Sequence, residues 1–183
     1  MLSTEDTYVW RGVFALFTGL LLLFYRVDGQ NRSTPRPDFS GSWDMDSSRS
    51  ESAHQDVPIG SVSLIIRQTP TDISIETRRT EDPSSPMVSE TLVFLLSGAE
   101  RTNSAATEHP VKAKAHWDGP KLVAETEREI NGATVTTMQV FRLENYRKEL
   151  VVEKTLSVQH GYQSPGAAKT SGSGRDVFIR AKQ

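Results

Sequence analysis

The chain has no cysteine among its 183 residues and carries almost no excess charge. Without cysteine it has no disulfides, no thiolate metal ligands and no thiol nucleophile, so its fold depends on a hydrophobic core. Its 21 lysines and arginines are balanced by 23 aspartates and glutamates. Domains that bind nucleic acid or anionic membrane surfaces carry a basic excess, so we expect no nucleic-acid partner.

Motifs for catalysis and cofactor binding are also missing from the sequence. It contains no G-x-S-x-G or H-E-x-x-H pattern, and the segment 166–170 lacks the first half of a phosphate-binding loop. The four histidines, His54, His109, His116 and His160, are scattered without the short spacing of metal ligands. We therefore predict a protein that is not an enzyme and that holds no metal and no cofactor.

The N-terminal region contains a long uncharged apolar run, Gly12–Tyr25. This run is shorter than the about 20 apolar residues that cross a bilayer, and a pattern that ends in Gly29 follows it. We predict a signal peptide at 1–29, which would place the protein in the periplasm or outside the cell. The alternative is an uncleaved N-terminal anchor, which would be the protein's only link to a membrane.

The remaining chain has the length of one domain. Cleavage after Gly29 removes 29 of the 183 residues and leaves 154, enough to build a single core. Residues 30–38 contain Pro35 and Pro37, which fit a linker better than a helix or a central strand. The folded domain is therefore predicted at 39–183.

Beyond the linker, apolar and polar residues alternate with a period of two, which is typical of half-buried strands. The run Val111–Trp117 is the clearest case, because Val, Ala, Ala and Trp alternate with Lys, Lys and His. Asn131 and Gly132 favour a two-residue type I′ turn between two such strands. After a first strand that begins at Phe39, strands are predicted near 62–67, 73–78, 88–97, 100–102, 111–117, 121–130, 134–143, 149–158 and 176–182.

These nine or ten strands, joined by hairpins without long crossovers, predict an all-β fold, an antiparallel up-and-down meander. Closure into a barrel removes the exposed edges of so many strands, and a two-sheet sandwich is the alternative. Only 47–57 suggests a helix, a short one after the first strand. Long loops are expected at 81–87 and at 159–175, where glycine is frequent.

The first strand contains the sequence F-S-G-S-W at 39–43. It resembles the F-x-G-x-W pattern of lipocalins and related calycin barrels. The resemblance implies that Gly41 permits a close approach at a bend. It also implies that Trp43 closes one end of the barrel under an arginine near the last strand, for which Arg175 and Arg180 are the candidates.

A second resemblance extends over nearly the whole domain. The D-F-S-G-S-W start, the W-D-G-P-K-L-V sequence at 117–123 and the terminal V-F-I-R resemble a group of exported, functionally uncharacterised bacterial proteins with lipocalin-like barrels. The resemblance implies the fold and export, and it supplies no catalytic residues. Trp117, like Trp43, is expected to plug the core, since large aromatic side chains mostly stabilise cores.

Four polar residues share the predicted inner face with apolar neighbours: Gln68, Arg79, Arg128 and Lys154. A cation in an apolar cavity is costly unless it meets an anion, so we expect these residues to receive the carboxylate or phosphate of an amphipathic ligand. Two alternatives remain at this point. A bulge would shift the register and turn these side chains outward, or they would reach water at the barrel mouth.

The sequence thus predicts an exported, non-enzymatic, lipocalin-like barrel that binds a small hydrophobic or amphipathic molecule, such as a lipid with an acidic head. The main alternative is a filled, ligand-free barrel that acts in the cell envelope through its outer face and loops. A barrel enzyme for a small apolar substrate would need a buried titratable cluster in the cavity. A binding barrel needs a cavity on the order of several hundred Å³, which a filled barrel lacks.

Overall fold

The computed structural model describes residues 36–54, 60–80, 85–104, 110–160 and 170–182. The chain divides into two compact units, 1–32 and 33–183. The signal peptide or anchor predicted at 1–29 lies outside the described residues, as does most of the predicted linker. Within the described ranges, no helix has the length and apolar character needed to cross a membrane.

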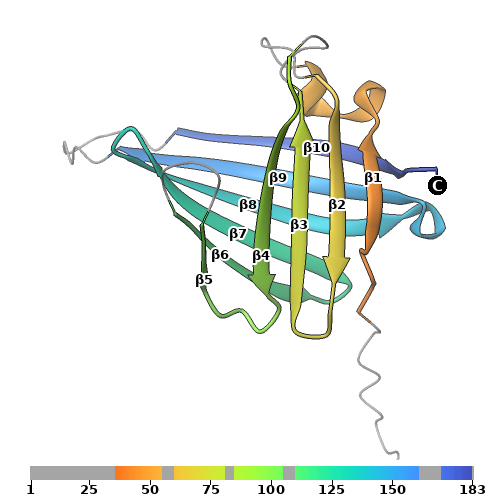
Figure 1. Ribbon diagram of the computed structural model, residues 1–183, viewed down its shortest axis with the longest axis horizontal. Coiled ribbons are helices and arrows are strands. Elements are labelled where there is room, and N and C mark those ends of the chain that lie inside the picture. Colours follow the sequence, from red (N-terminus) through yellow and green to blue (C-terminus); the bar gives the residue numbers. More distant parts are fainter. Residues whose placement is uncertain (1–35, 55–59, 81–84, 105–109, 161–169, 183) are drawn as a thin grey trace, which may run out of the picture. The chain divides into compact units, whose positions relative to one another are not determined.

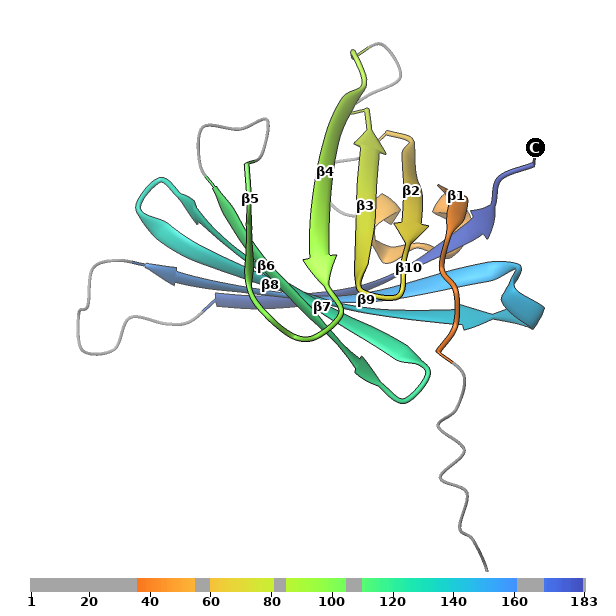
Figure 2. The ribbon, with the colours of Figure 1, turned by 60° about the horizontal axis from the view of Figure 1, so that its bottom comes forward.

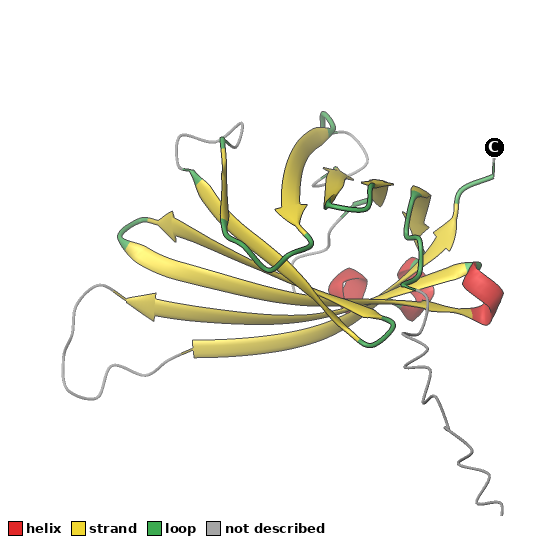
Figure 3. Ribbon diagram, turned by 90° about the horizontal axis from the view of Figure 1, so that it is seen from below, coloured by secondary structure: helices red, strands yellow, loops and turns green. Residues whose placement is uncertain are grey.

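Ten antiparallel strands form one sheet in the second unit, as Figure 1 shows. The predicted all-β meander is confirmed. Figure 3 shows how little helix accompanies the strands. The strands are β1 (Gly41–Met45), β2 (Val62–Gln68), β3 (Asp72–Arg79), β4 (Val88–Leu95), β5 (Arg101–Asn103), β6 (Val111–Asp118), β7 (Lys121–Ile130), β8 (Ala133–Glu144), β9 (Glu149–His160) and β10 (Thr170–Arg180). The three short 3-10 helices are η1 (Ser47–Arg49), η2 (Glu51–His54) and η3 (Asn145–Arg147).

The sheet curls into a nearly closed barrel because its first and last strands pair. Met45 of β1 lies opposite Phe178 of β10. All consecutive strands are hydrogen-bonded in ladders, with one exception. β4 and β5 do not pair, and they form the two ends of the sheet. We call the junction of β4 with the β5–β6 hairpin the seam, and Figure 2 shows it from a second direction. The barrel therefore has one position where backbone pairing does not hold its wall.

The turn between β7 and β8 has the predicted type I′ character. Asn131 has φ of +50° and Gly132 has φ of +75°. A type I′ turn needs positive φ at both central residues, which Asn and Gly adopt more easily than other residues. The turn sets the long β7–β8 register in which Arg128 lies opposite Val135.

Aromatic side chains fill one end of the barrel, which we call the closed end. Phe39, Trp43, Phe94, Phe141 and Phe178 are each at most 1% exposed. They belong to one continuous cluster of buried apolar side chains. Each such side chain contributes about 2 kcal/mol through removal from water, so this end of the barrel supplies much of the folding energy.

The last strand begins earlier than the sequence predicts. β10 starts at Thr170, which pairs with Val158, and it continues through Gly172 and Gly174. The prediction of a loop over 159–175 was wrong at both ends, because β9 and β10 extend into it. Glycine and serine are weak strand formers, but cross-strand pairing with β9 outweighs that local preference.

Residues 47–54 contain two 3-10 helices, η1 and η2, where the sequence suggests a single helix over 47–57, and residues 55–57 lie outside the described part of the chain. Both lie against β10 beyond the point where β1 ends. Ser50 Oγ accepts a hydrogen bond from Val177 N (2.9 Å) and donates one to Val177 O (3.2 Å). Glu51 Oε2 accepts one from Arg175 N (3.1 Å). Side chains therefore satisfy backbone groups of β10 where no neighbouring strand does.

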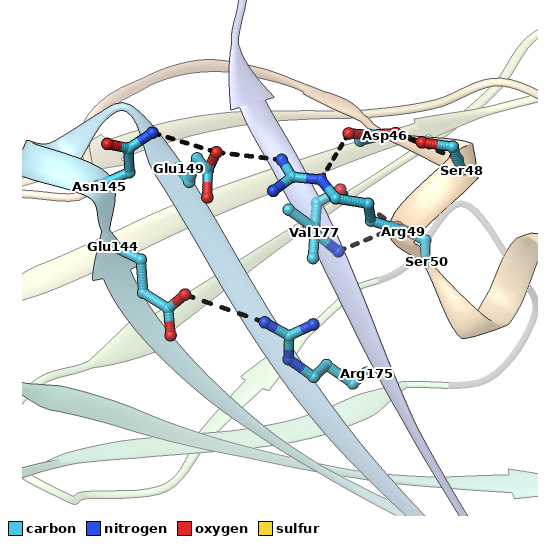
Figure 4. Close-up of polar contacts among 9 residues, drawn as sticks. All are labelled: Asp46, Ser48, Arg49, Ser50, Glu144, Asn145, Glu149, Arg175 and Val177. Atoms are coloured by element: carbon cyan, nitrogen blue, oxygen red, sulfur yellow. Dashed lines mark hydrogen bonds and ion pairs between the residues drawn. The ribbon is translucent and has the colours of Figure 1, made fainter.

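Ion pairs hold the same corner together on the outer surface, as Figure 4 shows. Arg49 bridges Asp46 (2.7 Å) and Glu149 (3.1 Å), which joins η1 to the start of β9. The pKa of Glu149 is lowered, chiefly by its hydrogen bond with Arg49. Such exposed pairs stabilise weakly, so their main effect is to fix the position of η1.

The end of the predicted linker already packs against the barrel. Pro37 is buried, and its carbonyl oxygen accepts a hydrogen bond from Gln68 Nε2 (3.1 Å). Arg36 lies over the ring of Trp117, with its Cζ 5.6 Å from the ring centroid. Arg36 and Pro37, which are predicted to belong to the linker, thus contact the barrel.

Candidate ligand-binding site

The end of the barrel opposite the aromatic cluster contains a cavity of about 440 Å³. We call it the mouth cavity. Inner-face residues of β3, β4, β7 and β8 line it, because alternation along each strand turns every second side chain inward. Its lining includes Arg79, Glu90, Leu92, Arg128, Thr137 and Gln139.

The register explains why this end is hollow. At the closed end Leu122 pairs with Phe141 across β7 and β8, whereas toward the mouth Thr126 pairs with Thr137 on the same face. Threonine side chains are much smaller than Phe and Leu and leave the space above the core unfilled. A separate void of only about 60 Å³ lies deeper, between Phe141 and Lys154.

Arg128 forms a bidentate ion pair with Glu90. Nη1 lies 3.1 Å from Oε1 and Nη2 lies 3.3 Å from Oε2. The two side chains are 26% and 30% exposed, so the pair is only partly screened by solvent. Arg128 comes from β7 and Glu90 from β4, which lie on opposite sides of the seam. Arg128, one of the cations predicted to receive the ligand, is therefore already paired with a carboxylate of the protein itself.

Arg79 is the cavity cation without such a partner. It ends β3, pairs with Val62 on one side and Val88 on the other, and is exposed at the rim of the cavity. Among the described residues, no carboxylate forms an ion pair with its guanidinium. Because Glu90 is taken by Arg128, the charged residues that line the mouth cavity leave one positive charge uncompensated.

Lys154 lies on the inner face of β9 and is paired with Asp176. Its Nζ is 2.7 Å from Asp176 Oδ2, and the aspartate side chain is fully buried. Ser52 of η2 donates its backbone N–H (3.0 Å) and its hydroxyl (2.7 Å) to the same carboxylate. Burial alone would raise the pKa of Asp176, but Lys154 and Ser52 outweigh it and the pKa is lowered. Lys154 lines the small deep void, and neither residue of the pair lines the mouth cavity.

Gln68 lies apart from the other three predicted ligand residues. It is on the inner face, but at the closed end, where it pairs with Ile73. Its Oε1 accepts a hydrogen bond from Phe39 N (3.1 Å), and its Nε2 donates to Pro37 O. Gln68 thus holds the N-terminal segment on the barrel, and the structure places it outside the candidate site.

The residues predicted to close the barrel lie together at the closed end. Arg180 covers Trp43, with its Cζ 4.3 Å from the ring centroid, while Arg175 contacts Glu144 on the outer surface at 3.9 Å. Gly41 has φ of +139°, and a Cβ at this position would meet the Arg180 guanidinium. These residues support the fold and lie away from the mouth cavity.

Trp117 joins the same end through stacking. Its ring lies 5.9 Å from that of Phe39, with an interplanar angle of 15°. The residue is half-buried, and part of its surface is covered by Arg36. Neither Trp117 nor Trp43 lines the mouth cavity.

Sequence reasoning missed the two carboxylates that pair with the inner cations. Glu90 has the same parity in β4 as the inner residues Leu92 and Phe94, so alternation alone indicated its face. Asp176 has the same parity as the inner residue Phe178, but it is the first residue of the predicted strand, where alternation gives little indication of the face. The described residues contain no cluster of histidine and acidic side chains that would hold a metal ion.

No protein-family model and no curated protein matches the sequence. Among solved structures, a mutant of the fluorescent protein UnaG is 17% identical, with a TM-score of 0.47 over 79% of this chain and 97% of that one. A mutant of the REP1-NXSQ fatty acid transporter is 13% identical, with a TM-score of 0.46 over 79% and 98%. Likenesses this distant assign neither a family nor a ligand to this chain.

Proposed function

We propose that this protein binds a small amphipathic molecule with an acidic group in the mouth cavity. The observation that carries the proposal is Arg79, which forms no ion pair with any carboxylate of the described residues and lies at the rim of a cavity of about 440 Å³. This volume lies within the range of about 300 to 1,000 Å³ that is typical of small-molecule sites. An arginine guanidinium binds carboxylates and phosphates through paired hydrogen bonds.

The lining favours an amphipathic ligand over a wholly apolar one. Threonines, Gln139 and charged groups surround Leu92 in the cavity, and the closed end is filled with aromatic side chains. Exposed apolar residues lie beyond the cavity on the same inner face, where Leu156 (42% exposed) pairs with Thr137 and Ile130 (45% exposed) lies two residues from Arg128. We propose that they contact the apolar part of the ligand while the acidic group lies at Arg79.

Two fluorescent probes of the same shape test this function. Anilinonaphthalene sulfonate carries an acidic group, and phenylnaphthylamine has the same ring system without it. The purified protein should bind both, with the sulfonate tighter. Replacing Arg79→Gln should weaken sulfonate binding by about tenfold and leave the neutral probe unchanged.

Matched variants separate the cavity from the outer surface. Arg67→Gln removes the same charge from an exposed position on β2 and should change neither affinity. Thr137→Phe fills the cavity and should weaken both probes, whereas Thr136→Phe adds the same ring to the outer face of β8 and should not. Equal effects of the two phenylalanine variants, or no binding of either probe to the folded wild type, would contradict the proposal.

We further propose that the protein carries its ligand without transforming it, and that it does so outside the cytoplasm. The first part is tested by native mass spectrometry of protein purified from its own host, followed by recovery of the bound compound unchanged after prolonged incubation with the protein. The second is tested by cell fractionation and by the mass of the mature chain. A full-length protein found in the cytoplasm would contradict export.

A further inference from the structure

In the described part of the chain, a single pair of side chains, Arg128 and Glu90, is hydrogen-bonded across the mouth half of the seam. Among the described residues, only two contacts with hydrogen bonds join β4 to the strands across the seam. The side chain of Asn103 holds the backbone of Val93 near the middle of β4, and Arg128 holds Glu90 nearer the mouth. Glu90 is therefore both a lining residue of the cavity and a tie across its wall.

We infer that Glu90 is an internal competitor for the ligand's acidic group and sets how tightly acidic molecules bind. This inference rests on the proposed function. Glu90 presents to Arg128 the planar, bidentate carboxylate that an acidic ligand would present. A ligand anion that reaches Arg128 as well as Arg79 must displace Glu90, and the cost of that exchange reduces its affinity.

The charges in the cavity make such an exchange feasible. Arg79 and Arg128 supply two positive charges, and Glu90 supplies one negative charge. A monoanion bound by Arg79 alone leaves the Arg128–Glu90 pair intact. A dianion, or an acid that bridges both guanidinium groups, gains a second ion pair by binding Arg128 as well as Arg79. The displaced Glu90 is exposed enough for water to solvate its carboxylate.

The exchange also has a consequence for the seam. When Glu90 leaves Arg128, β4 keeps its ladder with β3 but loses its only described tie to β7. Asn103 still holds Val93, so the movement is confined to the part of β4 between Val88 and Val93. Binding of an acid that engages both arginines is thus coupled to loosening of the mouth half of the seam.

Glu90→Gln tests the competition with the two probes. Removal of the carboxylate leaves Arg128 free, so sulfonate affinity should rise by about fivefold while neutral-probe affinity stays unchanged. Glu129→Gln is the matched control, because Glu129 is an exposed residue of β7 on the outer face. In an Arg128→Gln background, Glu90→Gln should give no gain.

The outcomes separate the two proposals. A gain of equal size in Glu129→Gln, or a gain that persists without Arg128, would show a general field effect and overturn the competition. No gain in Glu90→Gln, with both probes still bound by the wild type, would overturn the inference and leave the proposed function standing. Failure of the folded wild type to bind either probe would overturn both.

Spin labels give a second readout that does not depend on affinity. The cysteine-free chain allows labels at Thr91→Cys on β4 and Thr102→Cys on β5, both exposed and on opposite sides of the seam. The distance distribution between them should broaden in the wild type with a saturating dianion, 1-naphthyl phosphate at about pH 8, and not with the monoanionic anilinonaphthalene sulfonate or with phenylnaphthylamine. An unchanged or narrower distribution would contradict the loosening of the seam.

Discussion

Asn103 gives Val93 the two hydrogen bonds that a neighbouring strand would give. Val93 N donates to Asn103 Oδ1 (2.9 Å), and Asn103 Nδ2 donates to Val93 O (3.1 Å). The asparagine is only 7% exposed. A side-chain amide has the same donor and acceptor as a peptide group, so it continues the pairing of β4 where no strand lies in register.

We predict that Asn103→Leu lowers the free energy of unfolding by about 1 to 3 kcal/mol, because the substitution leaves the N–H and C=O of Val93 unpaired. Asn103→Asp keeps an acceptor for Val93 N but places a buried carboxylate oxygen against Val93 O, so its loss at neutral pH should be at least as large. Urea unfolding followed by circular dichroism measures both. Thr102→Ala, an exposed neighbour, should change stability by less than about 0.5 kcal/mol, and a comparable loss there would contradict the role of the amide.

The buried ion pair of Asp176 with Lys154 predicts a specific pH dependence of stability. The pKa of Asp176 is lowered from 3.8, so the folded state favours its charged form. Its contribution is fully present above the unfolded pKa and is lost as pH falls through the lower folded pKa. Stability should therefore decline in acid, below about pH 4.

Asp176→Asn should lower the free energy of unfolding at pH 7 by about 2 to 3 kcal/mol, since Lys154 loses its anion. The variant should also show a shallower decline in acid than the wild type, measured by urea unfolding from pH 7 to pH 3. Asp44→Asn replaces an exposed aspartate and serves as the control. A variant curve parallel to that of the wild type would show that Asp176 does not contribute to the acid response.

The close approach of Gly41 to Arg180 predicts an effect of crowding at the closed end. Gly41→Ala should destabilise the protein by about 2 kcal/mol or more, because the added methyl group displaces the guanidinium from Trp43. Gly98 also has a positive φ but has open space around it, so Gly98→Ala should cost only about 1 kcal/mol. Thermal unfolding of both variants measures the difference, and equal losses would leave only backbone strain as the cause.

The sequence predicts well which residues form strands, but it predicts poorly where along the barrel axis each residue lies. Alternation placed Gln68, Arg79, Arg128 and Lys154 on the inner face, and the register confirms that face for all four. Alternation does not say how far along the barrel a residue lies, because that depends on which strands pair and in what register. For this reason alternation alone does not separate Gln68 from the inner residues at the other end of the barrel.

The sequence alone does not predict which carboxylates pair with the inner cations, for a related reason. Glu90 and Arg128 are 38 residues apart and belong to strands that no ladder joins. Their contact depends on the curvature of the whole sheet, which no local pattern encodes. In contrast, the turn at Asn131 and Gly132 depends only on the φ preferences of two residues, and the sequence predicted it correctly.

The side chains of η1 and η2 have a consequence for how copies of the protein meet. Ser50 and Glu51 occupy the backbone N–H groups of Val177 and Arg175 on the flank of β10 that β1 leaves uncovered. A bare flank of this kind would be a template on which a strand of a second molecule could add, and such addition starts aggregation. The segment of η1 and η2 thus prevents a second molecule from extending the sheet at this flank, and it does so without changing the interior of the barrel.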